Sequence, residues 1–149
     1  QVFAIDVGYG QLDWNIRQDE RVTVLERTNA RYLESLDEPV SFVCIDVSFI
    51  SLKLILPAVK QWLTPQADII ALIKPQFEAG REEVGKGGVV RDPDVHARVC
   101  NEIKMWLVEK NWTVHGLTTS PITGPQGNVE FLVWAQKRVA PIVELQHLA

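Results

Sequence analysis

Two nearly continuous apolar segments, residues 41–46 (SFVCID) and 68–74 (DIIALIK), constrain the fold of this chain most. Both are short, rich in aliphatic residues and bounded by turn-forming residues, which is the pattern of a β-strand. Strands without polar alternation are typical of a parallel sheet that is covered on both faces. Each segment ends in a charged residue, Asp46 or Lys74. We therefore predict an α/β sheet in which these two strands are neighbours.

The rest of the chain alternates strand-like and helix-like stretches. Four more strands are expected, at residues 2–6, 22–26, 112–119 and 129–136. Helices are expected between the strands, at residues 11–19, 29–36, 51–63 and 92–111. This alternation predicts right-handed crossovers between parallel strands. The last two strands are joined by a loop alone, so a closing antiparallel pair is expected, followed by a tail at 141–149 that is a short helix or disordered.

Composition excludes several classes of protein. A chain of 149 residues with 46% hydrophobic and 23% charged residues is typical of one soluble domain. No apolar run approaches the ~20 residues that span a bilayer, and no stable membrane insertion is expected. The net charge of −4 gives no general footprint for nucleic acid, so RNA would need a local basic loop or a separate domain. Cys44 and Cys100 lack metal-ligand spacing and are interpreted as reduced thiols of a cytoplasmic protein.

The charged strand ends are the candidate site, because ligands of open α/β sheets bind outside the carboxyl ends of the strands. Lys74 either reaches water while its stem packs, or presents an amine to a ligand. Pro75 directly after it fixes the chain where the side chain leaves the sheet. A desolvated lysine can act as a base. Asp46 is either a turn or helix cap, or a carboxylate directed into the same crevice.

Two further features have an ordinary and a functional interpretation. Asp6 ends the first expected strand and either caps a turn or accepts hydrogen bonds from a ribose diol. Residues 80–92 contain four glycines together with Arg81, Lys86 and Arg91. This loop is either a mobile surface loop or a lid over a phosphate-bearing substrate.

Four strings carry a resemblance to a known family. They are residues 5–31 (IDVGYGQLDWNIRQDERVTVLERTNAR), 45–57 (IDVSFISLKLILP), 73–92 (IKPQFEAGREEVGKGGVVRD) and 120–134 (SPITGPQGNVEFLVW). They resemble the TlyA, or haemolysin A, family of FtsJ-like ribosomal RNA 2′-O-methyltransferases that use S-adenosylmethionine. The resemblance implies a Rossmann-like class I methyltransferase domain over residues 1–140 and ribosomal RNA, or a ribosomal subunit, as the partner.

The resemblance also implies roles for individual residues. Asp46, Lys74 and Glu130 match three members of a Lys-Asp-Lys-Glu catalytic tetrad, in which lysines act on the ribose hydroxyl. Asp6 matches the residue that binds the cofactor ribose, Asn29 the contact to its adenine, and Asp46 also borders the cofactor. The implied RNA contacts are Arg81, Lys86 and Arg91. No metal is implied.

The chain departs from the family pattern at its beginning. The family's first strand, its glycine-rich cofactor loop and its first tetrad lysine all precede residues 2–6. We therefore expect six strands, with a central one absent between 2–6 and 41–46, and a chain that is poorly stable alone or self-associates. Two alternatives remain open: a non-catalytic RNA- or partner-binding remnant, and a haemolysin-like membrane-active protein. The acidic composition argues against the latter.

Overall fold

The computed structural model describes residues 1–139, so the tail expected at 141–149 lies outside the described residues. Its strands are β1 (Val2–Ile5), β2 (Val22–Leu25), β3 (Val40–Ile45), β4 (Leu63–Ile73), β5 (Trp112–Thr119) and β6 (Phe131–Lys137). Its α-helices are α1 (Trp14–Arg17), α2 (Leu52–Trp62), α3 (Pro75–Glu78) and α4 (Pro93–Glu109). Single 3-10 turns are η1 (Ala30–Tyr32), η2 (Arg81–Glu83) and η3 (Pro125–Gly127). All six expected strands are therefore present.

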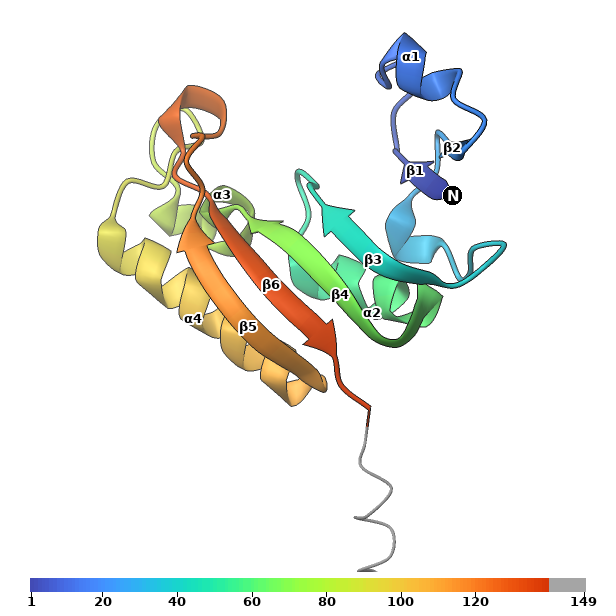
Figure 1. Ribbon diagram of the computed structural model, residues 1–149. Helices are drawn as coiled ribbons and strands as arrows, with labels where there is room; N and C mark the ends of the chain where they lie inside the picture. Colours follow the sequence, from blue (N-terminus) through green and yellow to red (C-terminus); the bar gives the residue numbers. More distant parts are fainter. Residues whose placement is uncertain (140–149) are drawn as a thin grey trace, which may run out of the picture.

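The strands form two separate sheets (Figure 1). One is the parallel pair β1–β2, and the other has the order β3-β4-β6-β5. Strands β3 and β4 are parallel, while β6 is antiparallel to both β4 and β5. The predicted neighbours and the closing antiparallel pair are confirmed. Among the described residues, β1 and β3 belong to different sheets and are not hydrogen-bonded to each other.

Helix α4 begins and ends where its sequence predicts. Asp92 caps it, since its carboxylate accepts a hydrogen bond from the Asp94 backbone N–H at 2.9 Å. Pro93 occupies the first turn, where its missing N–H is not needed. The helix ends at Glu109, and Asn111 adopts a left-handed conformation with a φ of 65°. One face is apolar and buried, which fixes α4 against the sheet.

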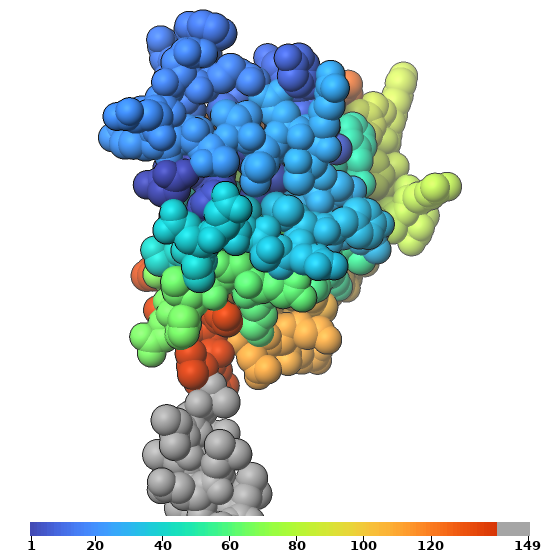
Figure 2. Space-filling view, turned by 90° about the vertical axis from the view of Figure 1, so that its right-hand side faces the viewer, coloured from blue at the N-terminus to red at the C-terminus, as the bar shows by residue number. Residues whose placement is uncertain are grey.

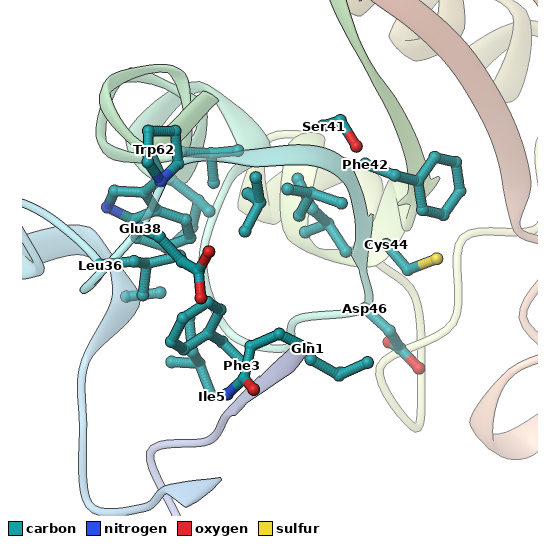
Figure 3. Close-up of a pocket in the computed structure, with 18 of the residues that line it drawn as sticks. Gln1, Phe3, Ile5, Leu36, Glu38, Ser41, Phe42, Cys44, Asp46 and Trp62 are labelled. Carbon is teal, nitrogen blue, oxygen red and sulfur yellow. The ribbon is translucent and has the colours of Figure 1, made fainter. Parts of the chain in front are cut away.

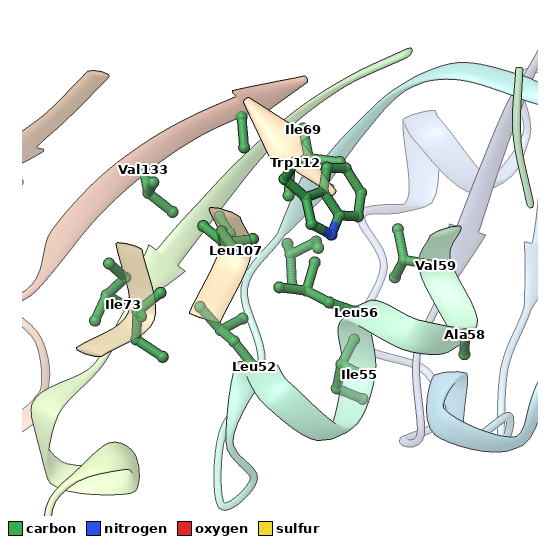
Figure 4. Packing of buried hydrophobic residues seen from close by; sticks show 14 of the residues in the cluster. Leu52, Ile55, Leu56, Ala58, Val59, Ile69, Ile73, Leu107, Trp112 and Val133 are labelled. Atoms are coloured by element: carbon green, nitrogen blue, oxygen red, sulfur yellow. The ribbon is translucent and has the colours of Figure 1, made fainter. Parts of the chain in front are cut away.

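The core lies between the four-stranded sheet and helices α2 and α4 (Figure 4). Ile69 and Val133 project from β4 and β6 toward Leu56 of α2 and Leu107 of α4, with Trp112 closing one end. Full burial of each such aliphatic side chain is worth about 1.5–3 kcal/mol. This core fixes the ends of β3, β4 and β6, where the candidate site lies.

The prediction that the sheet is covered on both faces is wrong for the face that points away from the core. The apolar sequences of 41–46 and 68–74 predict coverage on both faces, but Phe42 on β3 is 55% exposed. Trp134 on β6, which lies on the same side, is 45% exposed. The reason is that α2 and α4 both lie on one face of this sheet (Figure 1).

No helix of residues 1–139 is long and apolar enough to cross a membrane.

Two expected helices are much shorter than predicted. The stretch 11–19 contains only the single turn α1, and 29–36 contains only η1. Leu33 returns to an extended conformation after η1, and its carbonyl accepts a hydrogen bond from Trp62 Nε1 at 2.8 Å. Neither turn has a buried residue, so neither has an apolar stripe that would favour a longer helix. The contact to Trp62 ties this segment to α2.

Candidate active site

The Lys74 side chain lies at the centre of the candidate site. It follows β4 directly and is only 9% exposed. Its Nζ lies 2.6 Å from Asp46 Oδ1 and donates a hydrogen bond to Ser48 Oγ at 3.1 Å. Asp46 follows β3, the parallel neighbour of β4, so adjacent strand ends bring the two charges together. The Asp46 side chain is 71% exposed, so one side of this ion pair is open to solvent.

Glu130 approaches the same strand end from β6. The antiparallel register pairs Ile73 with Phe131, so the residue before Phe131 lies beside the residue after Ile73. The Glu130 carboxylate is buried, and its Oε2 accepts a hydrogen bond from Gln76 Nε2 at 2.9 Å. Its side-chain partner is thus Gln76 and not Lys74.

A glycine makes room for this carboxylate. A Cβ atom at Gly124 would overlap the carboxylate of Glu130. A side chain at position 124 would therefore displace this carboxylate from its present place. Gln76 and Gly124 together enclose the Glu130 carboxylate from two sides.

An aromatic pair, the exposed Phe49 and the half-buried Phe77, follows the two strand ends. Phe49 and Phe77 each follow one partner of the ion pair by three residues, and their ring centroids are 4.9 Å apart at an interplanar angle of 52°. Phe49 is 89% exposed and has a φ of 64°. A left-handed conformation is unusual for a bulky residue and points to a functional constraint.

The loop of residues 80–92 is hydrogen-bonded to the rest of the protein through Gly88 and Val90. The side chains of Arg81, Lys86 and Arg91 are exposed, and the part of the chain coloured yellow-green protrudes from the surface in Figure 2. The buried Asn128 side chain accepts a hydrogen bond from the Val90 backbone N–H at 3.0 Å. It also donates to the carbonyl oxygens of Gly88 (3.0 Å) and Pro125 (3.2 Å). Asn128 therefore connects the basic loop to the loop that precedes Glu130.

The expected cofactor residues lie on the β1–β2 side of the molecule. Asp6 is exposed, and its Oδ1 accepts a hydrogen bond from the Gly8 backbone N–H at 2.9 Å. Asn29 is exposed and caps η1 through the Arg31 backbone N–H at 3.0 Å. The two segments are joined by a bond from the Thr28 N–H to the Asp6 carbonyl oxygen at 3.0 Å. Asp6 thus caps a turn, as one of its two interpretations predicted. This cap uses only one of its two carboxylate oxygens.

A pocket of about 540 Å³ separates the two sheets (Figure 3). Phe3 and Ile5 of β1 line one side, and Cys44 and Asp46 line the β3 side. Ala30, directly after Asn29, also borders it. The pocket thus connects the neighbours of Asp6 and Asn29 with the catalytic candidate Asp46.

Sequence reasoning identified the charged residues of this site but missed their partners. Asp46, Lys74 and Glu130 gather at one edge of the sheet, whereas Asp6 and Asn29 lie across the pocket. The missed residues are Ser48, Phe49, Gln76 and Phe77. A signal was present, since an aromatic residue follows each charged strand end by three positions. Within residues 1–139 no cluster of metal-ligating side chains is found.

The α/β fold is that of a methyltransferase-type domain. The model of the FtsJ-like methyltransferase family matches residues 1–137. The chain therefore belongs to the FtsJ-like methyltransferase family, and its Rossmann-like class I fold is that of such enzymes.

Individual relatives agree with this family. A candidate rRNA methyltransferase of Bacillus subtilis is 54% identical over 136 residues, covering 89% of this chain and 48% of the relative. The 16S/23S rRNA (cytidine-2′-O)-methyltransferase TlyA of Mycobacterium tuberculosis is 50% identical over 135 residues, covering 89% and 50%. The solved structure of a candidate hemolysin from Streptococcus thermophilus superposes with a TM-score of 0.88 at 46% identity, covering 93% of this chain and 51% of that one. The chain spans about half the length of the curated relatives it matches.

Proposed function

We propose that this domain transfers the methyl group of S-adenosylmethionine to a ribose 2′-hydroxyl of ribosomal RNA. The observation that carries the proposal is the Lys74–Asp46 pair, at 2.6 Å, on neighbouring parallel strand ends beside the buried Glu130. The activity for which the Mycobacterium tuberculosis relative is named supports the same reaction. Methylation of ribosomal RNA would place the protein in the cytoplasm.

The chemistry assigned to the chain is proton transfer and orientation. S-adenosylmethionine supplies an electrophilic methyl group on a sulfonium sulfur. The Lys74 amine would polarise the 2′-hydroxyl and help to remove its proton, while the oxygen takes the methyl group and the methyl–sulfur bond breaks to release S-adenosylhomocysteine. Asp46 holds the amine in place, and Glu130 orients the substrate from the other side. Alignment of the hydroxyl with the methyl group accounts for much of the rate.

The surface around the amine is suited to an unpaired nucleotide. RNA-modifying proteins hold unstacked bases on aromatic side chains. Phe49 and Phe77 offer such a surface beside Lys74, so we assign them to the base of the target nucleotide. Arg81, Lys86 and Arg91 are exposed on the neighbouring loop and are assigned to RNA phosphates. Glu82, Glu83 and Asp92 balance these three cations within residues 80–92, so the assignment rests on the exposure of the cations and not on a net positive loop.

The residues present are compatible with the cofactor. The second oxygen of the exposed Asp6 carboxylate is available to a ribose diol, and the Asn29 side chain is exposed near it. Asp6 would hold the ribose, Asn29 the adenine, and Asp46 would border the reactive end.

The test compares two proteins. One is this chain of 149 residues, and the other joins it to the half of the Bacillus subtilis relative that it does not match, which we call the extended protein. Isothermal titration with S-adenosylmethionine and incorporation of labelled methyl groups into ribosomal subunits are measured for both. Methylation of a ribose 2′-hydroxyl by the extended protein supports the proposal. A folded extended protein that binds S-adenosylmethionine without methylating ribosomal RNA would overturn it.

A further inference from the structure

Two segments of the site run side by side and contact each other at three successive places. The first segment, residues 46–52, follows β3, and the second, residues 74–78, follows β4. Lys74 pairs with Asp46, Phe77 packs on Phe49, and Glu78 binds the beginning of α2. The three contacts follow the same order along both segments. The first two belong to the site already described, whereas the third has no role in it.

Glu78 uses both of its carboxylate oxygens in this third contact. Oε2 accepts a hydrogen bond from Ser51 Oγ at 2.6 Å, and Oε1 accepts one from the Leu52 backbone N–H at 2.8 Å. Ser51 is the N-cap of α2, so the acceptor reaches the helix end from a distant part of the sequence. A carboxylate at a helix N-terminus is electrostatically favoured.

Burial of the Glu78 carboxylate is unfavourable for its charged form. Burial raises the pKa of the Glu78 carboxyl, and the hydrogen bonds from Ser51 and Leu52 offset part of that effect. Ser51 accepts a bond from the Lys53 N–H at 3.1 Å, which satisfies one of the unpaired N–H groups at the start of α2, and Glu78 satisfies the N–H of Leu52. Because this second acceptor comes from the turn after β4, it also ties the start of α2 to that turn.

What Glu78 adds is control over the conformation of Phe49. The left-handed φ of Phe49 persists only if the residues on both sides of it are fixed. On one side Ser48 accepts a hydrogen bond from Lys74, and on the other side Ser51 is held by Glu78. Loss of the second anchor would leave the exposed ring free to follow its ordinary backbone preference.

We propose that Glu78 is a positioning residue that fixes the segment from Asp46 to Leu52 against the turn after β4, so that Phe49 presents its ring to the target base. Glu78 itself touches neither RNA nor cofactor in this role, and it acts through Ser51 and Leu52. The proposal rests on the proposed function, because it concerns the same methyl-transfer site.

The experiment uses three variants of the extended protein: Glu78→Ala, Glu78→Gln and, as a matched control, Glu109→Ala. Glu109 is an exposed carboxylate at the end of α4. The glutamine side chain can still accept from the Leu52 N–H and donate to Ser51 Oγ, so it should replace the glutamate. Measurements are kcat and KM for RNA methylation per folded molecule, the Kd for S-adenosylmethionine, and amide hydrogen exchange of residues 47–52.

The expected result is specific to a positioning role. Glu78→Ala should lower kcat/KM for RNA by about 10- to 100-fold, as small misplacements of positioning groups do. Its Kd for S-adenosylmethionine should stay within about twofold of the unchanged protein, and exchange of the Leu52 amide should accelerate. Glu78→Gln should restore kcat/KM, and Glu109→Ala should change nothing.

The remaining outcomes distinguish a failure of the Glu78 proposal from a failure of the proposed function. If the unchanged extended protein methylates RNA and Glu78→Ala does so equally well, the role of Glu78 is overturned while the proposed function stands. If Glu78→Ala is impaired only because less of it folds, with normal kcat/KM per folded molecule, the residue is structural and the proposal is also wrong. If the unchanged extended protein does not methylate RNA, the proposed function fails, and the positioning role falls with it.

Discussion

Lys74 Nζ and Asp46 Oδ1 lie 2.6 Å apart, at the ends of two strands that are parallel neighbours in the sheet. The amine is nearly buried while the carboxylate is mostly exposed. Stability alone does not explain such a pair, because a partly exposed ion pair contributes only about 0–1 kcal/mol. A nearly buried lysine that is held by Asp46 and Ser48, beside a carboxylate that is open to solvent, is suited to a hydroxyl substrate.

The first prediction concerns this amine. Lys74→Ala in the extended protein should lower methylation by at least about 10²- to 10⁴-fold, the usual contribution of a general base. The fold should remain, since the core lies between the sheet and helices α2 and α4 and excludes Lys74. Methyl incorporation and circular dichroism are measured beside Lys104→Ala, an exposed lysine of α4. Retained methylation by folded Lys74→Ala would exclude the proposed mechanism.

The second prediction concerns the space around Glu130. Gly124→Ala places a Cβ atom against the Glu130 carboxylate, which lies at the far end of a flexible side chain and can move away. We expect the free energy of unfolding to change by less than about 1 kcal/mol, while kcat falls about 10- to 100-fold because the carboxylate is displaced. Urea unfolding and methylation kinetics check the two values.

Gly116→Ala is the matched control for this change. Nothing lies within 4 Å of a Cβ atom at Gly116, and its backbone is not left-handed. Both activity and stability should stay close to those of the unchanged protein. Equal activities of the two variants would mean that the position of the Glu130 carboxylate does not matter for the reaction.

Much of this arrangement could be predicted from the sequence, and the reasons are physical. Apolar runs identify strands, and parallel strands bring their carboxyl ends to one edge, so the amino-acid order alone is enough to pair Asp46 with Lys74. Phe49 and Glu78 could not be assigned in this way. Their roles depend on a left-handed backbone and on a contact between two loops, and hydrophobic periodicity carries no information about either.

Tertiary contacts that the sequence pattern does not reveal also explain where the predicted fold was wrong. Residues 29–36 contain a cap and apolar residues, a pattern that predicts a helix, but tertiary contact of Leu33 with Trp62 favours an extended chain there. Coverage of β3 on both faces is the expectation from its apolar sequence. Burial of an apolar residue depends on which face the helices occupy, and both α2 and α4 occupy the same one.

The third prediction is a pH dependence that arises from Glu78. Burial raises the pKa of this carboxyl in the folded protein above its unfolded value. The folded state therefore favours the protonated form, and this contribution to stability is fully present below the unfolded pKa. It is lost as the pH rises through the folded pKa.

Glu78→Gln removes this titration while keeping the two hydrogen bonds. The free energy of unfolding of Glu78→Gln, relative to the unchanged protein, should therefore increase as the pH rises above the ordinary pKa of a glutamate. Urea unfolding of both proteins across the acid-to-neutral range measures the difference. A difference that stays constant with pH, or that decreases, would contradict a raised pKa of Glu78 in the folded state.

The fourth prediction concerns the facing edges of β1 and β3. Both strands border the pocket of about 540 Å³, and neither is paired across it among residues 1–139 (Figure 3). Unpaired edges of apolar strands recruit other strands. This chain of 149 residues should therefore self-associate with increasing concentration, whereas the extended protein, which can supply a strand to the gap, should stay monomeric.

Sedimentation velocity across a range of concentrations measures this difference, and an edge variant tests its cause. Ser41→Lys places a charge on exposed β3 beside the pocket, which should weaken association because charged edge residues oppose strand pairing. Thr113→Lys adds the same charge on exposed β5, at the opposite edge of the sheet, and should leave association through β3 unchanged. If Ser41→Lys and Thr113→Lys associate equally, the contact does not run through β3. If the unchanged chain is monomeric at every concentration, the gap between the sheets does not recruit a strand, and the extended protein should then gain little stability from filling it.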